Sequence, residues 1–390
     1  MLSSKKIRLI VITICFYAIG ALEARPLNVL FVVAYFPAPS QTYILNLMIG
    51  LIDKGHNVSI FASRKNDVYE KLDPTIEKYH LLDHVIYESF SDPLPECDIV
   101  FCQSATLGKN IVENKNLTEW LKDKKLIVCL RGADITQNNV QNNPTMYQRL
   151  FERCDLFLPV CDYFKTLVVK LGCNPDKVIV HHSAIDCKKF FFKMRKKIKR
   201  KREIIQLISV CRLVKKKGLE HALEAVAQLI KSYKNVHFTI VGSGHLQRRL
   251  AKLAQKLKIT NKVTFFGWAT HDQIVTLFDK SHIFLSPSVT AESGEQEGIA
   301  NALKEAMAMG LIAVATRHAG TPELVEDNVS GFLVAEGDSV ALVKKIKYVL
   351  KNSKQWKSIG IAARKKVEDE FEINKSIKQL EELFYKLLAV

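Results

Sequence analysis

The chain has 390 residues and a formal net charge of +17, from 57 Lys or Arg against 40 Asp or Glu. At about 100–200 residues per domain, this length predicts two domains, each able to bury its own core. Hydrophobic residues make up 48% of the chain, which is ordinary for a folded soluble protein. The excess positive charge favours anionic partners such as nucleotides, nucleic acid or acidic lipid surfaces, but charge alone does not choose among them.

Nine cysteines are scattered along the chain, and most of them lie inside apolar runs. Their number is odd, no C-x-x-C motif occurs, and no Cys/His cluster has the spacing of a zinc site. We therefore expect reduced, buried thiols, as in a cytosolic protein.

The N-terminus has the outline of a signal peptide, because Lys5, Lys6 and Arg8 precede an apolar run from Leu9 to Leu22. The run is short for a membrane span. A cleaved signal, a weak membrane anchor and a misassigned start codon all remain open for residues 1–25. We expect the rest of the chain to be cytoplasmic, and peripheral association or anchoring at the inner membrane stays open.

Residues 26–187 alternate apolar runs of strand length with polar or helical stretches, which predicts βαβ units and a parallel sheet. A helical pattern follows the first run and ends at Gly55. The expected strands of this half are Leu27–Val33, Asn57–Ala62, Asp98–Cys102, Leu126–Leu130, Leu156–Val160 and Val178–His182.

The run Lys188–Arg202 is a natural domain linker, because so many like charges repel one another too strongly to pack. The alternation then restarts over residues 203–370. The expected strands are Ile204–Cys211, Val236–Gly242, Lys262–Gly267, His282–Pro287, Leu311–Thr316 and Gly331–Val334. The fold class is thus α/β, with two Rossmann-like domains facing across a cleft. Residues 371–390 form a C-terminal helix that we expect to pack back on the first domain.

In such sheets ligands bind beyond the carboxyl ends of the strands, so the loops there are candidate sites. Arg212 and Lys217 follow the first strand of the second half, where two cations can clamp a diphosphate. The alternative is a solvated basic turn. The turn Gly242-Ser243-Gly244 is weak evidence of a ligand, and Thr270–Gln273 is a capping box with a structural role.

An acidic loop leads into an apolar helix at residues 288–310. If the helix begins near Gly298, the amides of Gly298, Ile299 and Ala300 are free donors that attract phosphate. Glu305 could then accept ribose hydroxyls, and Glu297 the hydroxyls of a donor sugar. The alternative is that both carboxylates only cap or brace the helix.

Together these residues resemble the retaining GT-B glycosyltransferases of family 4, especially the branch that builds exopolysaccharides of the colanic-acid type. The resemblance covers nearly the whole chain from about Leu27. It rests on Phe36–Leu45, Arg131-Gly-Ala-Asp134, Arg212 with Lys217-Gly218, Glu297-x7-Glu305 with the following Ala306–Gly310, and Thr316–Val325.

The resemblance implies a nucleotide-sugar donor, UDP- or GDP-linked, and a glycan or lipid-linked acceptor, with no cofactor and no metal. Arg212 and Lys217 would stabilise the leaving diphosphate, Glu305 would hold the ribose and Glu297 the sugar. The base would lie near Trp268. The acceptor residues implied in the first domain are Ser40, Gln41, Arg131 and Asp134.

The sequence departs from the family pattern at four positions. Cys211 and Ala184 stand where glycine is common, Gln41 where Glu is frequent, and Arg131 where many relatives have histidine. Each glycine loss removes a conformation that only glycine enters cheaply.

Rival functions come from other classes. A sugar-nucleotide epimerase or hydrolase could use the same scaffold, because fold does not fix function. The basic run Lys188–Arg202 suggests a protein that binds nucleic acid or another anionic polymer. This run lacks interleaved aromatics after Phe192 and any recognised nucleic-acid-binding module, so we expect no nucleic-acid partner. The same run could touch an anionic membrane surface, which suits a lipid-linked acceptor.

Overall fold

A computed structural model describes residues 25–37, 41–65, 73–87, 94–195 and 203–389. Residues 1–24 of the predicted N-terminal segment, Ser40 and residues 196–202 of the predicted linker lie outside this part of the chain. Within it, no helix combines the length and the hydrophobicity that crossing a bilayer requires.

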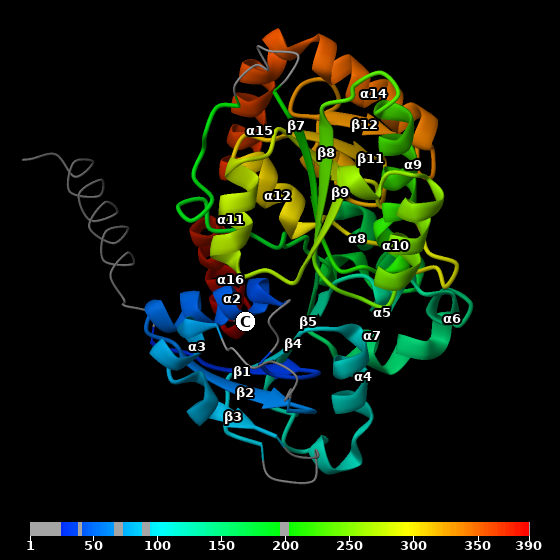
Figure 1. Cartoon of the computed structure of the whole chain (residues 1–390). Coiled ribbons are helices and arrows are strands. Elements are labelled where there is room, and N and C mark those ends of the chain that lie inside the picture. Colours follow the sequence, from blue (N-terminus) through cyan, green and yellow to red (C-terminus); the bar gives the residue numbers. More distant parts are fainter. Residues whose placement is uncertain (1–24, 38–40, 66–72, 88–93, 196–202, 390) are drawn as a thin grey trace, which may run out of the picture.

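Two parallel sheets of six strands each organise the described residues (Figure 1). The first comprises β1 (Asn28–Val33), β2 (Asn57–Ala62), β3 (Val85–Ile86), β4 (Ile99–Cys102), β5 (Lys125–Leu130) and β6 (Leu156–Pro159). Its order is β3-β2-β1-β4-β5-β6, so β1 lies between β2 and β4. Phe31 of β1 is paired with Ile60 on one side and Phe101 on the other, and all three are fully buried.

The second sheet has the order β12-β11-β10-β7-β8-β9. Its strands are β7 (Ile205–Val210), β8 (Val236–Val241), β9 (Val263–Gly267), β10 (Ile283–Ser286), β11 (Ile312–Thr316) and β12 (Phe332–Val334). The chain order reverses at β1 in one sheet and at β7 in the other, and a ligand crevice opens at such points. The predicted fold class of two Rossmann-like domains is confirmed.

Helices flank both sheets, as parallel strands require. With the first sheet, as the N-terminal domain, lie α2 (Thr42–Asp53), α3 (Pro74–Lys78), α4 (Ala105–Glu113), α5 (Ala133–Thr136), α6 (Asn138–Gln141), α7 (Gln148–Arg153) and α8 (Asp162–Lys170). With the second, as the C-terminal domain, lie α9 (Leu219–Leu229), α10 (Gln247–Lys256), α11 (His271–Asp279), α12 (Asn301–Ala308), α13 (Thr321–Leu324), α14 (Ser339–Lys351) and α15 (Trp356–Glu370).

The last helix, α16 (Ile373–Leu388), packs on the N-terminal domain (Figure 1). The Phe384 ring lies edge-on to Phe101, with ring centroids 5.5 Å apart. A Cβ at Gly50 of α2 would stand only 2.0 Å from the Ile377 side chain, so a glycine lets the two helices approach closely.

The prediction of a strand at Val178–His182 is wrong. Only an isolated bridge joins Val178 to Phe157. Beyond it, the Ile179 and His181 amides donate to the Phe157 and Pro159 carbonyls, each at 3.0 Å, but no strand is formed. Side chains add to these bonds: a ring nitrogen of His181 lies 3.0 Å from the Ser376 carbonyl, and one of His182 lies 3.0 Å from the Val160 carbonyl.

The expectation that Lys188–Arg202 is too charged to pack is wrong for its first half. Phe190 is buried, and so is Arg195. The Arg195 guanidinium donates to four backbone carbonyls, those of Phe278, Asp279, Ser281 and Met309. Carbonyl acceptors satisfy a guanidinium without a second charge, so this part of the basic run is held against the C-terminal domain.

Candidate active site

A cavity of about 400 Å³ lies between the two domains at the carboxyl ends of their strands. The N-terminal domain lines it through the ends of β1 and β5, and the C-terminal domain through the loops after β7, β8, β9 and β10. Ten of the twelve residues predicted for the site line this cavity: Gln41, Arg131, Arg212, Lys217, Trp268, Glu297, Gly298, Ile299, Ala300 and Glu305.

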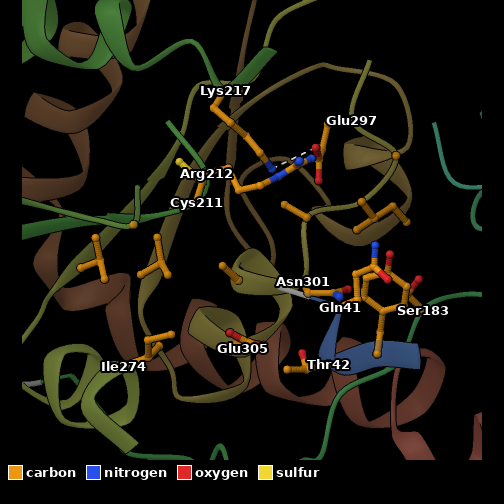
Figure 2. Close-up of a pocket in the computed structure, with 18 of the residues that line it drawn as sticks. Gln41, Thr42, Ser183, Cys211, Arg212, Lys217, Ile274, Glu297, Asn301 and Glu305 are labelled. Atoms are coloured by element: carbon orange, nitrogen blue, oxygen red, sulfur yellow. Dashed lines mark ion pairs between the residues drawn. The ribbon is translucent and has the colours of Figure 1, made fainter. Parts of the chain in front are cut away.

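The two predicted cations lie together at one side of the cavity (Figure 2). The Arg212 side chain is exposed, and no bond among the described residues uses its guanidinium. Lys217 lies in a short 3-10 turn that ends at Gly218, where the chain takes a left-handed φ of 58°. A Cβ there would stand 1.9 Å from the Pro287 carbonyl oxygen, so the turn that places Lys217 requires glycine.

Glu297 faces these cations. Its carboxylate forms ion pairs with Lys217 at 2.9 Å and with Lys216 at 3.3 Å. Burial alone would raise the pKa of this carboxyl, but the charges of Lys217 and Lys216 outweigh burial and hold the pKa well below its ordinary value. Glu297 is therefore ionised at neutral pH.

Lys216 is a site residue that the sequence did not single out. Its side chain is buried and also forms an ion pair with Glu295 at 2.8 Å. The Lys215-Lys216-Lys217 run gave no way to tell which ammonium groups face inward, because a short 3-10 turn has no fixed buried side. Lys216 thus pairs with two glutamates of the acidic loop, Glu295 and Glu297.

The acidic loop before α12 is held by the N-terminal domain. The Asn138 backbone amide donates to the Ser293 carbonyl at 2.8 Å, and the Asn138 side chain donates to the Glu292 carbonyl at 3.0 Å. The Gln296 amide donates to the Thr136 hydroxyl at 3.1 Å. The loop therefore belongs to the contact between the two domains.

The prediction that a helix begins near Gly298 is wrong by three residues. α12 begins at Asn301, and Ala300 has the extended conformation of its N-cap. Glu297 thus lies in the loop and not at the mouth of the helix. No hydrogen bond among the described residues uses the amides of Gly298, Ile299 or Ala300. Gly298, Ile299 and Ala300 still line the cavity, from the loop that leads into α12.

Glu305 lies on the face of α12 that lines the cavity (Figure 2). Only 6% of the residue is exposed, and no hydrogen bond or ion pair among the described residues involves its carboxylate. Burial raises the pKa of this carboxyl to about 7, although Lys304 and Lys189 oppose the shift. An uncompensated buried acid is costly, so it indicates a polar partner that is not part of the chain.

Lys304, the neighbour of Glu305, points to the domain contact. It is 1% exposed and donates to the Ser183 carbonyl and, at 3.0 Å, to the Asn301 side-chain oxygen. Burial lowers the pKa of its ammonium to about 7. Lys304 therefore couples the position of α12 to the N-terminal domain.

On the N-terminal side of the cavity, Arg131 is the most constrained residue. Its guanidinium donates to Gln103 at 2.7 Å and Ser183 at 3.2 Å, and it lies over the Tyr43 ring at 4.3 Å from the centroid. Its Nε is buried and forms no hydrogen bond with the residues that the structure describes. Gln41 also lines the cavity.

Asp134 does not line the cavity, so the structure gives no support to its prediction as an acceptor residue. Its carboxylate accepts the backbone amides of Ala105 at 2.9 Å, Gly132 at 2.9 Å and Arg131 at 3.3 Å. These bonds shape the turn that carries Arg131. Asp134 therefore acts on the site only through the backbone.

Trp268 lines the cavity beyond β9 and is 47% exposed, so one part of its indole is open to a planar ligand. No group of three or more His, Cys, Asp or Glu residues able to hold a metal ion occurs in the described ranges. The eight cysteines of these ranges are free thiols. The predicted capping box at Thr270 and Gln273 is present at the start of α11.

Comparison with known proteins agrees with this architecture. Residues 190–366 match the family model of glycosyl transferases group 1. The chain is 34% identical over 264 residues to the amylovoran biosynthesis glycosyltransferase AmsK of Erwinia amylovora, covering 67% of this chain and 64% of AmsK. It is 28% identical to WcaL of Salmonella typhimurium, named as a colanic acid biosynthesis glycosyltransferase, over 92% of this chain and 99% of WcaL.

Solved structures show the same fold. The crystal structure of Anabaena HepE in complex with UDP-glucose matches with a TM-score of 0.75 and 18% identity, over 92% of this chain and all of HepE. A glycosyltransferase from Rickettsia africae matches with a TM-score of 0.71 and 19% identity, over 94% of this chain and 99% of that protein. Residues 190–366 therefore match a glycosyl transferases group 1 domain, and the chain as a whole has the GT-B fold and resembles glycosyltransferases.

Proposed function

We propose that this chain transfers a sugar from a nucleotide-sugar donor to a glycan or lipid-linked acceptor, with retention of anomeric configuration, in exopolysaccharide or lipopolysaccharide assembly. The sequence similarity to AmsK and WcaL supports the polymer class. The observation that carries the proposal is the buried carboxylate of Glu305, which has no partner in the described chain and shares a cavity with two cations.

The proposed roles follow the shape of the cavity. Arg212, whose guanidinium has no bond within the described part of the chain, and Lys217 take the diphosphate and stabilise the charge that develops on it when its bond to the sugar breaks. Glu305 accepts the two ribose hydroxyls, and Trp268 lies beside the base. Lys217 exchanges part of its ion pair with Glu297 for the diphosphate, which leaves Glu297 free to accept sugar hydroxyls.

The acceptor enters from the N-terminal domain, where Arg131 and Gln41 line the cavity. Retention is proposed with attack from the side of the leaving group. Anomeric proton couplings of the product, measured by NMR, distinguish retention from inversion.

We also propose that the enzyme works on the cytoplasmic side of a membrane and touches anionic lipid through its basic linker. Phe191 and Met194 are about half exposed beside the lysines of this segment. Co-sedimentation with vesicles of phosphatidylglycerol, compared with phosphatidylcholine, tests this contact. Equal binding to both vesicles, or to neither, contradicts it.

A panel of UDP- and GDP-sugars screened by thermal shift tests the donor assignment, since a ligand that binds only the folded state raises stability by mass action. We expect one nucleotide class to raise the melting temperature of wild type, and to raise that of Glu305→Gln less at the same concentration. An epimerase or hydrolase would instead convert the donor at the same rate with or without a glycan acceptor. No shift with any nucleotide contradicts the proposed function.

A further inference from the structure

His318 lies directly behind Glu297, at the end of β11, and is 0% exposed. Its Nε2 accepts the backbone N–H of Glu297 at 2.9 Å. Its Nδ1 lies 2.6 Å from a carboxylate oxygen of Glu336, and the other oxygen of Glu336 accepts the Thr290 amide at 2.8 Å. A continuous chain of hydrogen bonds thus joins the loops after β10, β11 and β12 behind the proposed sugar site.

These bonds fix the protonation state of the imidazole. An amide N–H can only donate, so Nε2 must carry a free lone pair. The single ring proton then lies on Nδ1 and is donated to Glu336. An imidazolium would set N–H against the N–H of Glu297 and would add a buried positive charge beside Lys217.

The chain takes a strained path to make this arrangement. Ala319, the next residue, has a φ of 40°, a conformation that residues with a Cβ adopt at a cost. The His318 amide also turns back to the Thr316 carbonyl at 2.8 Å. A tight backbone turn therefore aims the ring at the Glu297 peptide.

We propose that His318 is a positioning residue for sugar transfer: oriented by Glu336, it holds the Glu297 peptide in place as long as its imidazole is neutral, so transfer fails in acid. This inference rests on the proposed role of Glu297 at the donor sugar. His318 does not line the cavity, so it acts through Glu297 and not on the substrate.

The charged groups that face the imidazole are Glu336, Glu297 and Lys217. Burial has the largest effect and lowers the pKa of His318 below its ordinary value, while the hydrogen bond to Glu336 and the two carboxylates oppose this shift. The ring is thus neutral at pH 7. The imidazole of His318 becomes protonated only at lower pH, and the loss of Glu336 would lower its pKa further.

Three variants separate positioning from mere packing. His318→Leu keeps the bulk and removes the acceptor, and we expect kcat to fall by about tenfold or more while UDP affinity stays within about twofold. His318→Gln offers an amide oxygen to the Glu297 N–H but does not titrate. We expect this variant to keep most of the wild-type activity and to lose the decrease of kcat at low pH, the acid limb. Glu336→Gln should shift that limb to lower pH.

The assay is release of UDP or GDP from UDP-glucose and GDP-mannose at saturating donor, with water as acceptor, between pH 5 and 8. Saturation separates the acid limb of kcat from any titration of Glu305, which affects donor affinity. Thermal melts confirm folding. An unchanged acid limb in both His318→Gln and Glu336→Gln overturns the proposal, and so does wild-type kcat in His318→Leu.

A measurement that needs no turnover keeps the proposal testable if the donor assignment fails or a variant does not fold. In the nucleotide-free protein at pH 7.5, ¹⁵N imidazole resonances, assigned by their absence in His318→Gln, should show the Nδ1–H tautomer. If His318→Gln does not fold, the shift of the same resonances in Glu336→Gln assigns them. The Nε2–H tautomer or an imidazolium overturns the proposal whatever the donor is.

Discussion

Replacing Glu305 by glutamine should stabilise the nucleotide-free protein in alkaline solution while weakening its nucleotide binding. In the folded chain the pKa of this carboxyl is raised from 4.5 to about 7, mainly by burial. At about 1.4 kcal/mol per pH unit, burying the ionised form costs about 3 kcal/mol of folding free energy. The neutral amide has no such charge to bury.

The sign of the pH dependence follows from this raised pKa. Between pH 4.5 and 7 the unfolded carboxyl has lost its proton while the folded one retains it, so wild-type stability falls as the pH rises through this window. Above pH 7 the full cost remains. The advantage of Glu305→Gln should therefore be small at pH 5 and approach about 3 kcal/mol at pH 8.5.

Urea denaturation of both proteins at pH 5 and 8.5 measures this difference. Glu119→Gln is a matched control, because the Glu119 side chain is 88% exposed and should show no such gain. At pH 8.5 calorimetry should show that Glu305→Gln loses about 1.5–3 kcal/mol of UDP or GDP binding, the value of a charged hydrogen bond. If Glu305→Gln is destabilised equally at both pH values, the carboxylate has partners in the folded state and the reasoning is refuted.

Alanine at Arg212 or Lys217 should lower turnover at least about tenfold, equivalent to about 1.4 kcal/mol, because charge develops on the leaving diphosphate. EDTA should change the activity little. Activity that is lost in EDTA and restored by Mn²⁺ would show that a metal stabilises this charge. Glu297→Gln should leave free UDP or GDP affinity unchanged but impair transfer, since its expected partners are sugar hydroxyls; equal losses by calorimetry in both measurements would contradict this role. Asp134→Asn should cost about 1–3 kcal/mol in urea denaturation, because an amide cannot accept all three backbone N–H bonds, with unchanged nucleotide affinity as the control. Stability equal to wild type would show that these bonds do not hold the turn.

The sequence by itself was sufficient to predict the two-domain fold and eleven of the twelve strands in the described part of the chain. A strand buried on both faces must be apolar along its whole length, and the polar loops between such runs must gather at one end of a parallel sheet. This is why Arg212, Lys217, Glu297 and Glu305 could be expected in one cavity. The two-residue strand β3 left no such run to detect.

Tertiary contacts decided the rest, because they join residues that are distant along the chain. Asp134 is committed to backbone amides, Arg195 is buried among carbonyls from two other segments, and α12 begins late because the N-terminal domain binds the loop before it. The partners of Glu297 are likewise set across the fold, by Lys216 and Lys217. Local sequence patterns report which residues are apolar, whereas the direction of a buried polar side chain depends on which donors and acceptors the folded chain brings within hydrogen-bonding distance.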